Sequence, residues 1–192
     1  MHVHFGANIM TSENLANAGP LGLLGFSLTT ILLSVHNLGF FGLDKTILAA
    51  AICLGGLAQI FAGMIEFKRS KMFTATVFTY FGLFWVTFAL INTEMGILKT
   101  VDHTSMATFF LLISILALIF LLGTLKSPKV LQLAFLVLTI TLFVLTIGAY
   151  TEIANVTKVG GALGVITGAI VLYIAAAEIL NEQYQKPILP LF

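Results

Sequence analysis

The chain has 192 residues, of which 59% are hydrophobic and only 9% are charged, and its mean hydropathy is +1.07. Soluble domains carry about 25% charged residues, so this composition excludes a surface solvated by water alone and makes lipid the solvent for much of the chain. The net charge of +1 gives no attraction toward nucleic acid.

The charged residues divide the chain into a short polar segment and six apolar windows. Residues 1–18 are expected to form an N-terminal cytoplasmic tail, and the last five windows hold 19 to 23 residues between their flanking charges. A membrane-spanning helix needs about 20 residues. We therefore predict an all-α integral membrane protein whose residues 19–192 form one bundle of six transmembrane helices per subunit, at 20–37, 46–67, 73–92, 106–125, 130–150 and 159–180.

The basic residues of the loops predict the orientation of these helices. The side that holds both termini carries six of them, against three on the other side, Lys45, Lys99 and Lys158. Because positive loops stay in the cytoplasm, we expect a multi-pass plasma-membrane protein with both termini inside. The short loops leave no room for an ATPase or a soluble catalytic domain.

No pattern in the chain is typical of an enzyme or a metal site. The four histidines lie in the tail or at helix ends, and none has the His-x-x-x-His spacing of a metal site. We expect no catalytic residues, no metal and no cofactor. The single cysteine, Cys53, is expected to be a packed thiol inside an apolar segment.

Polar residues inside the windows are scarce and therefore informative. Ser27, Thr30 and Ser34 share one helical face, where they either join helices or line a pore. Gln59 lies near the middle of the second window and must face another helix or a wet cavity. Glu66 either pairs with the neighbouring basic residues or stands at the mouth of a path.

Two glycine-containing segments indicate close contacts. Gly160, Gly164 and Gly168 form a ridge that lets another backbone approach, within the chain or in a second subunit. The turn from Asn17 to Pro20 begins the first helix, where free N–H groups and the helix dipole suit a carboxylate.

The same turn carries a family resemblance. Residues 17–23 resemble the Asn-Pro-Ala-Pro-Leu-Gly-Leu signature of the acetate uptake transporter family, the succinate–acetate permeases, and the similarity covers nearly the whole chain. It continues in Gly55-Gly56-x-x-Gln59-x-x-Ala62-Gly63-x-x-Glu66, Phe84-Trp85 and Gly123-Thr124-Leu125-Lys126. Two positions depart from the family pattern: Ala18-Gly19 replaces Pro-Ala, and Phe81 stands where bacterial members often have Tyr.

The resemblance implies a homo-oligomer, a hexamer, with a separate path for acetate and similar small carboxylates, sometimes succinate, in each subunit. It implies a constriction formed by Phe26, Phe81 and Leu138. The Asn17 turn and Gln59 are expected as polar stations for the carboxylate. The Thr29 and Thr30 hydroxyls are further donors that we expect along the path.

Two other functions remain open at this point. A membrane sensor or assembly protein could be built on the same scaffold, and an intramembrane enzyme is the third alternative. A measurement of labelled-acetate flux separates carboxylate transport from these two alternatives.

Overall fold

The computed structural model describes residues 15–93 and 102–192. Most of the expected tail and Lys99, one of the basic residues used to predict the orientation, lie outside the described residues. Six helical segments of the described chain are long and apolar enough to cross a membrane, which confirms the predicted fold class. They are α1 (Gly19–Asn37), the continuous run of α2 (Lys45–Ala50), η2 (Ala51–Ala58) and α3 (Gln59–Lys68), then α4 (Met72–Asn92), α5 (His103–Gly123), α6 (Lys129–Thr151) and α7 (Ala154–Tyr184).

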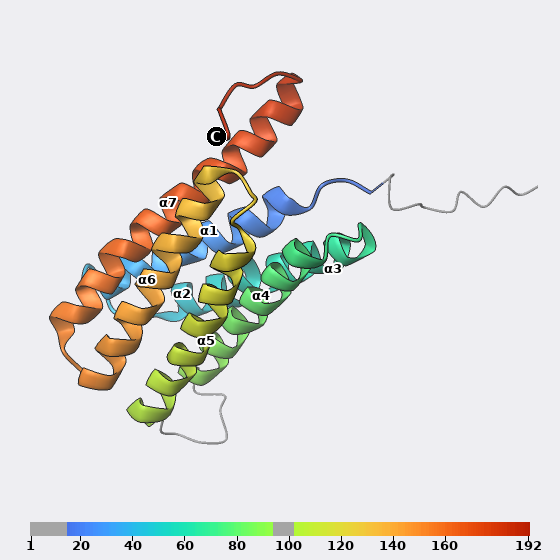
Figure 1. Cartoon of the computed structure of the whole chain (residues 1–192). Helices are drawn as coiled ribbons and strands as arrows, with labels where there is room; N and C mark the ends of the chain where they lie inside the picture. Colours follow the sequence, from blue (N-terminus) through green and yellow to red (C-terminus); the bar gives the residue numbers. More distant parts are fainter. Residues whose placement is uncertain (1–14, 94–101) are drawn as a thin grey trace, which may run out of the picture.

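The helices form one bundle in which α1 lies between two neighbours (Figure 1). On one side α1 packs against α7, and on the other against η2 and α3. Helix α6 packs between α5 and α7, while α4 packs against α3 and η2. This arrangement encloses the space that is described below as the candidate site.

Two helices have bounds that differ from the expected ones by more than one residue. Helix α7 begins at Ala154 and ends at Tyr184, beyond the expected range 159–180, and α5 begins at His103 instead of at residue 106. The side chain of Asp102 accepts a hydrogen bond from the Ser105 backbone N–H, 2.8 Å away, and so caps α5. Charged residues mark where the apolar stretch ends, but a helix can continue through them into the polar region.

The second span contains a π-helical segment that the sequence pattern did not predict. Residues Ala51–Ala58 of η2 are wound more loosely than the α-helices on either side. The Ala50 carbonyl accepts a hydrogen bond from the Thr29 hydroxyl at 3.4 Å, and the Leu54 carbonyl lies against Gly25. Carbonyl groups in and next to the π-helical segment therefore lie against α1.

Glycines permit the close approach of α1 to its neighbours. A Cβ atom at Gly164 would collide with the Ser34 hydroxyl, and one at Gly168 would lie 2.5 Å from Ile31. The predicted ridge on α7 therefore serves contacts within the chain, chiefly with α1. Ser27 and Ser34 are buried at this contact, so they join helices and do not line a pore.

The outer surface of the bundle is apolar. Large side chains such as Phe61, Met64, Leu112 and Ile119 are more than half exposed, as expected for a surface that meets lipid or other subunits. Cys53 is also exposed, so the expectation of a packed thiol was wrong. Gly55 and Gly56 take the inward positions of η2, which leaves Cys53 on the outer face.

We expect Gly25→Ala to destabilise the bundle. The new methyl group would collide with the Leu54 carbonyl, and such overpacking costs about 1–3 kcal/mol, more than the roughly 1 kcal/mol gained in helix propensity. Thermal unfolding of the purified protein measures the effect. Gly42→Ala is the matched control, because a Cβ atom there meets nothing within 4 Å. A melting temperature for Gly25→Ala at or above that of the wild type would contradict the packing described.

Candidate functional site

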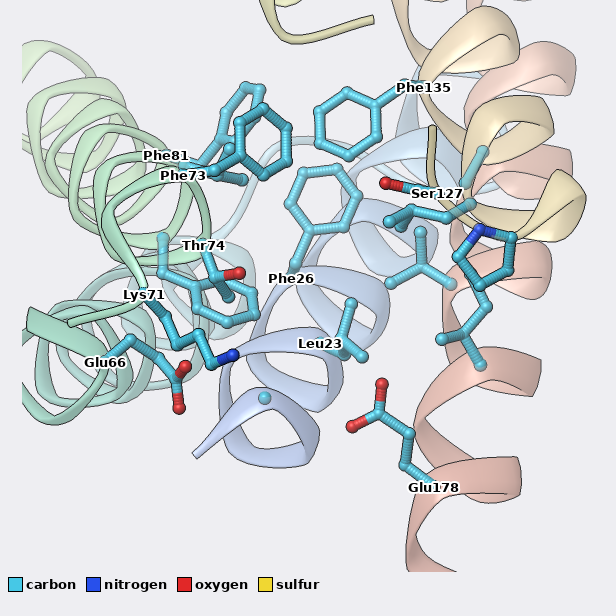
Figure 2. Close-up of a pocket in the computed structure, with 18 of the residues that line it drawn as sticks. Leu23, Phe26, Glu66, Lys71, Phe73, Thr74, Phe81, Ser127, Phe135 and Glu178 are labelled. Carbon is cyan, nitrogen blue, oxygen red and sulfur yellow. The ribbon is translucent and has the colours of Figure 1, made fainter. Parts of the chain in front are cut away.

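A cavity of about 400 Å³ lies inside the bundle, between α1, α3, α4, α6 and α7 (Figure 2). Most of its wall is apolar, and its charged residues come from the end of α3, the segment that joins α3 to α4 and the end of α7. We call this polar end the mouth, and define it by Asn17, Glu66, Arg69, Lys71 and Glu178. Six of the eight residues singled out in the sequence line the cavity: Asn17, Phe26, Gln59, Glu66, Phe81 and Leu138.

The three residues expected at a constriction are brought together in the structure. Phe26 and Phe81 meet edge to face with their ring centroids 5.5 Å apart. Both belong to the same buried apolar cluster as Leu138, and each of the three is at most 7% exposed. They are therefore neither lipid-facing nor scattered. We call this group the neck.

Aromatic residues that the sequence reasoning missed extend the neck. Phe120 packs against Phe81 with a centroid distance of 5.8 Å, and Phe73 and Phe135 complete the group. Rings in these edge-to-face arrangements are held in place by about 0.5–1.5 kcal/mol per pair beyond simple burial. Nothing in their spacing along the sequence indicated that α4, α5 and α6 would place them together.

At the mouth, Glu66 forms the ion pair that was one of the two alternatives from the sequence, and it also lines the cavity. Its carboxylate is buried and forms an ion pair with Arg69, with Nη1 and Oε1 2.6 Å apart. The same Oε1 accepts a hydrogen bond from the Ala18 backbone N–H at 3.1 Å. Glu66 therefore joins α3 to the first turn of α1 while it also lines the cavity.

Asn17 connects Glu66 and Arg69 to α7. Its side-chain oxygen accepts hydrogen bonds from the Gly19 backbone N–H at 3.0 Å and from Arg69 at 2.9 Å. Its side-chain nitrogen donates to Glu178 at 3.1 Å. The N–H groups of Ala18 and Gly19 are thus already occupied by the protein, and a substrate carboxylate would have to compete with Glu66 and Asn17 for them.

Gln59 is fully buried on the cavity wall with one polar atom left unpaired. Its side-chain nitrogen donates to the Gly55 carbonyl at 2.7 Å, whereas its oxygen has no hydrogen-bond partner among the described residues. Because the Gly55 carbonyl can only accept, the nitrogen must be the atom that faces it. Gln59 therefore offers a ligand two groups: its side-chain oxygen as an acceptor, and the second hydrogen of its amide nitrogen as a donor.

The two threonines expected along the path do not line this cavity. Thr29 is fully buried between α1 and the second span, where its hydroxyl donates to the Ala50 carbonyl. Thr30 is 8% exposed, and its hydroxyl has no partner within the described chain. Both lie on α1, but the helix presents Phe26 to the cavity instead.

Three charged residues at the mouth were not singled out by the sequence reasoning. Figure 2 shows Lys71 beside Glu66 on one side of the cavity and Glu178 on the other. Arg69 lines the same region. Each of the three lies just outside an apolar window or at its end, so the sequence suggested membrane topology as their role. Their convergence depends on tertiary packing.

The fold and this cavity define a multi-pass membrane protein that encloses a largely apolar cavity with a charged mouth. The chain belongs to the GPR1/FUN34/yaaH family, whose sequence profile matches residues 2–191. The resemblance seen in the sequence is confirmed. This chain is 41% identical to the succinate-acetate/proton symporter SatP of Escherichia coli strain K12, over 95% of this chain and 98% of that protein.

Two further comparisons agree with this assignment. A solved structure described as the bacterial acetate channel SatP is 41% identical, has a TM-score of 0.89 and covers 93% of this chain and 99% of that chain. Acetate permease A of Emericella nidulans is 30% identical over 93% of this chain and 66% of that protein. These relatives are described as a symporter, a channel and a permease.

We expect Glu66→Ala to destabilise the protein, because the substitution leaves Arg69 and the Ala18 N–H without their acceptor. Loss of a buried charged hydrogen-bonding partner costs about 2–3 kcal/mol. Thermal unfolding measures the loss. The control is Glu182→Ala, at an exposed carboxylate outside the cavity, which should change stability by less than about 0.5 kcal/mol. Equal melting temperatures for the two variants would refute the connecting role of Glu66.

Proposed function

We propose that this protein carries acetate and related small carboxylates across the plasma membrane, through the cavity of each subunit and without chemical change of the substrate. The observation that carries the proposal is the cavity itself, in which Phe26, Phe81 and Leu138 form an apolar neck behind a polar mouth. Its support is the 41% identity to a succinate-acetate/proton symporter over nearly the full length of both chains.

Uptake of labelled acetate into vesicles containing the purified protein tests the function. Vesicles without protein measure the acetic acid that crosses the lipid by itself. Uptake above that background supports a transporter or channel. Uptake equal to the background would favour a sensor or assembly protein on the same scaffold. Labelled succinate in the same vesicles tests whether a dicarboxylate is also carried.

Leu138 is expected to limit the size of the substrate. Because its side chain contributes bulk and no hydrogen bond to the neck, Leu138→Ala should admit larger acids such as lactate. The measurement is the ratio of lactate flux to acetate flux. Leu133→Ala is the control, since Leu133 lies on the same helix with 45% of its surface exposed. An unchanged flux ratio in a correctly folded Leu138→Ala protein would count against a neck at this position.

Gln59 is expected to be a polar station for the substrate carboxyl group. Gln59→Leu keeps nearly the same volume and removes the amide, so acetate flux should fall while the fold is retained. Removing one hydrogen-bonding group of this kind costs about 1 kcal/mol, or roughly fivefold in rate. Normal acetate flux in Gln59→Leu would mean that the amide only joins η2 to α3.

We further propose that both termini lie in the cytoplasm and that the mouth opens on that side. The support is the excess of basic residues in the segments that carry the mouth. Peptide tags on the two termini should both resist protease in intact cells and should both be cut after permeabilisation. Cleavage of either tag in intact cells would contradict this orientation.

The assembled form that we propose is a homo-hexamer embedded in the bilayer. Its support is the family resemblance together with the large apolar side chains on the outer faces of the bundle. Native mass spectrometry of the protein released from detergent measures the number of subunits. A monomer under conditions that preserve acetate binding would contradict the hexamer.

A further inference from the structure

Glu178 is a carboxylate at the mouth whose one hydrogen-bond partner among the described residues is a neutral amide. It is half-buried near the end of α7, and its carboxylate points toward the cavity (Figure 2). Its hydrogen bond comes from the neutral amide of Asn17, at 3.1 Å. Within the described residues, no cation lies at ion-pair distance from it.

The charged groups around Glu178 do not neutralise it directly. From α3, the buried Glu66 faces the mouth and is already matched by Arg69. Lys71, before α4, lines the cavity but is paired with neither carboxylate. Glu182, on the same helix as Glu178, is exposed and outside the cavity.

The other elements around Glu178 contribute no charge to the cavity. At the start of α1, an added Cβ atom at Gly19 would lie 3.0 Å from the Glu178 carboxylate, and Gly19 carries no charge. The α6 wall is apolar, and Ser127, Pro128 and Leu191 are the uncharged residues beside it. An ionised Glu178 therefore stands at the mouth without an ion-pair partner among the described residues, where it would repel a substrate that is itself an anion.

Beyond the mouth, the cavity suits a neutral acid better than an anion. The neck offers aromatic rings and Leu138, and burying a bare carboxylate without donors is prohibitive. The unpaired polar atom of the fully buried Gln59 is an oxygen, which accepts a hydrogen bond from the hydroxyl of a carboxylic acid. A carboxylate, which only accepts, could use the second amide hydrogen of Gln59 but would be repelled by that oxygen, whereas the neutral acid can use both groups.

We propose that Glu178 exchanges a proton with the carboxyl group of the substrate at the mouth, so that the substrate passes the neck as the neutral acid. The proposal rests on the proposed function. In one direction, the O–H bond of protonated Glu178 breaks and an O–H bond forms on the substrate carboxylate. Glu178 is left as an anion held by the Asn17 amide, and it takes a new proton from water.

In the opposite direction, the neutral acid arrives through the neck and returns its proton to Glu178. The substrate then leaves the mouth as a carboxylate. Donor and acceptor are the same functional group, so the transfer is nearly balanced in energy and can run either way. One proton accompanies each carboxylate, and no net charge crosses the membrane.

Glu178→Gln tests this role, because glutamine keeps the shape and the contact with Asn17 but has no proton to exchange. At about pH 8, where almost no acid is protonated in solution, acetate flux should fall about tenfold or more. At about pH 5, where much of the acid is already protonated, flux should stay within about twofold of the wild type. Glu182→Gln should follow the wild type at both pH values. A Glu178→Gln profile that matches Glu182→Gln would overturn the proposal.

A second measurement uses the wild-type protein and does not depend on a variant that folds. Acetate uptake is compared at one pH in vesicles whose interior is made positive or negative with potassium and valinomycin. We expect equal rates, since the neutral acid carries no charge through the neck. Faster uptake into positive vesicles would mean that the bare anion crosses, and would overturn the proposal while leaving the transport function intact. If the wild type carries no acetate at all, the proposed function itself fails.

Discussion

The close approach of α1 to η2 on one side and to α7 on the other holds the cavity in shape. Gly25 lies against the Leu54 carbonyl, and Gly164 and Gly168 of α7 lie against Ser34 and Ile31. Between hydrocarbon-facing helices, association depends on packing of this kind and not on the hydrophobic effect. With α1 fixed by its glycine contacts, Phe26 points into the cavity, and the first turn of α1 lies where Glu66 of α3 and Glu178 of α7 can both reach it.

The resulting cavity is polar at one end and apolar at the other. Charged and amide groups at the mouth can replace part of the hydration of a carboxylate, whereas the neck behind them is built from aromatic rings and Leu138. A small acid with an apolar body fits such a passage once its charge is removed. Proton exchange at Glu178 would supply that step, and it would explain how a path with an apolar neck serves an anionic substrate.

Much of the fold follows from the sequence because a helix that crosses a lipid bilayer must be apolar over about 20 residues. Five apolar windows of 19 to 23 residues have the length of a span, and a longer one precedes them, so the six helices were predicted from the spacing of charges. Phe26, Phe81 and Leu138 were found through a family resemblance, since nothing in their local sequence distinguishes them from other apolar residues. The π-helical winding of Ala51–Ala58 and the exposure of Cys53 were missed, because both depend on how the second span packs against its neighbours. Lys71 and Glu178 were missed at the cavity for the same reason: each lies at the end of a helix, and only the assembled bundle brings the two ends together.

The most direct test of the cavity as the substrate path is thiol labelling in a Cys53→Ala background. Leu131→Cys places a thiol on the cavity wall, and Leu133→Cys places one on the outer face of the same helix. A small charged methanethiosulfonate reagent is applied from the side of the mouth, with and without acetate, and acetate flux is measured afterwards. If the cavity is the path, the reagent blocks flux only in Leu131→Cys, and acetate slows that block. If the reagent leaves flux in Leu131→Cys unchanged after the thiol has reacted, the substrate does not pass through this cavity.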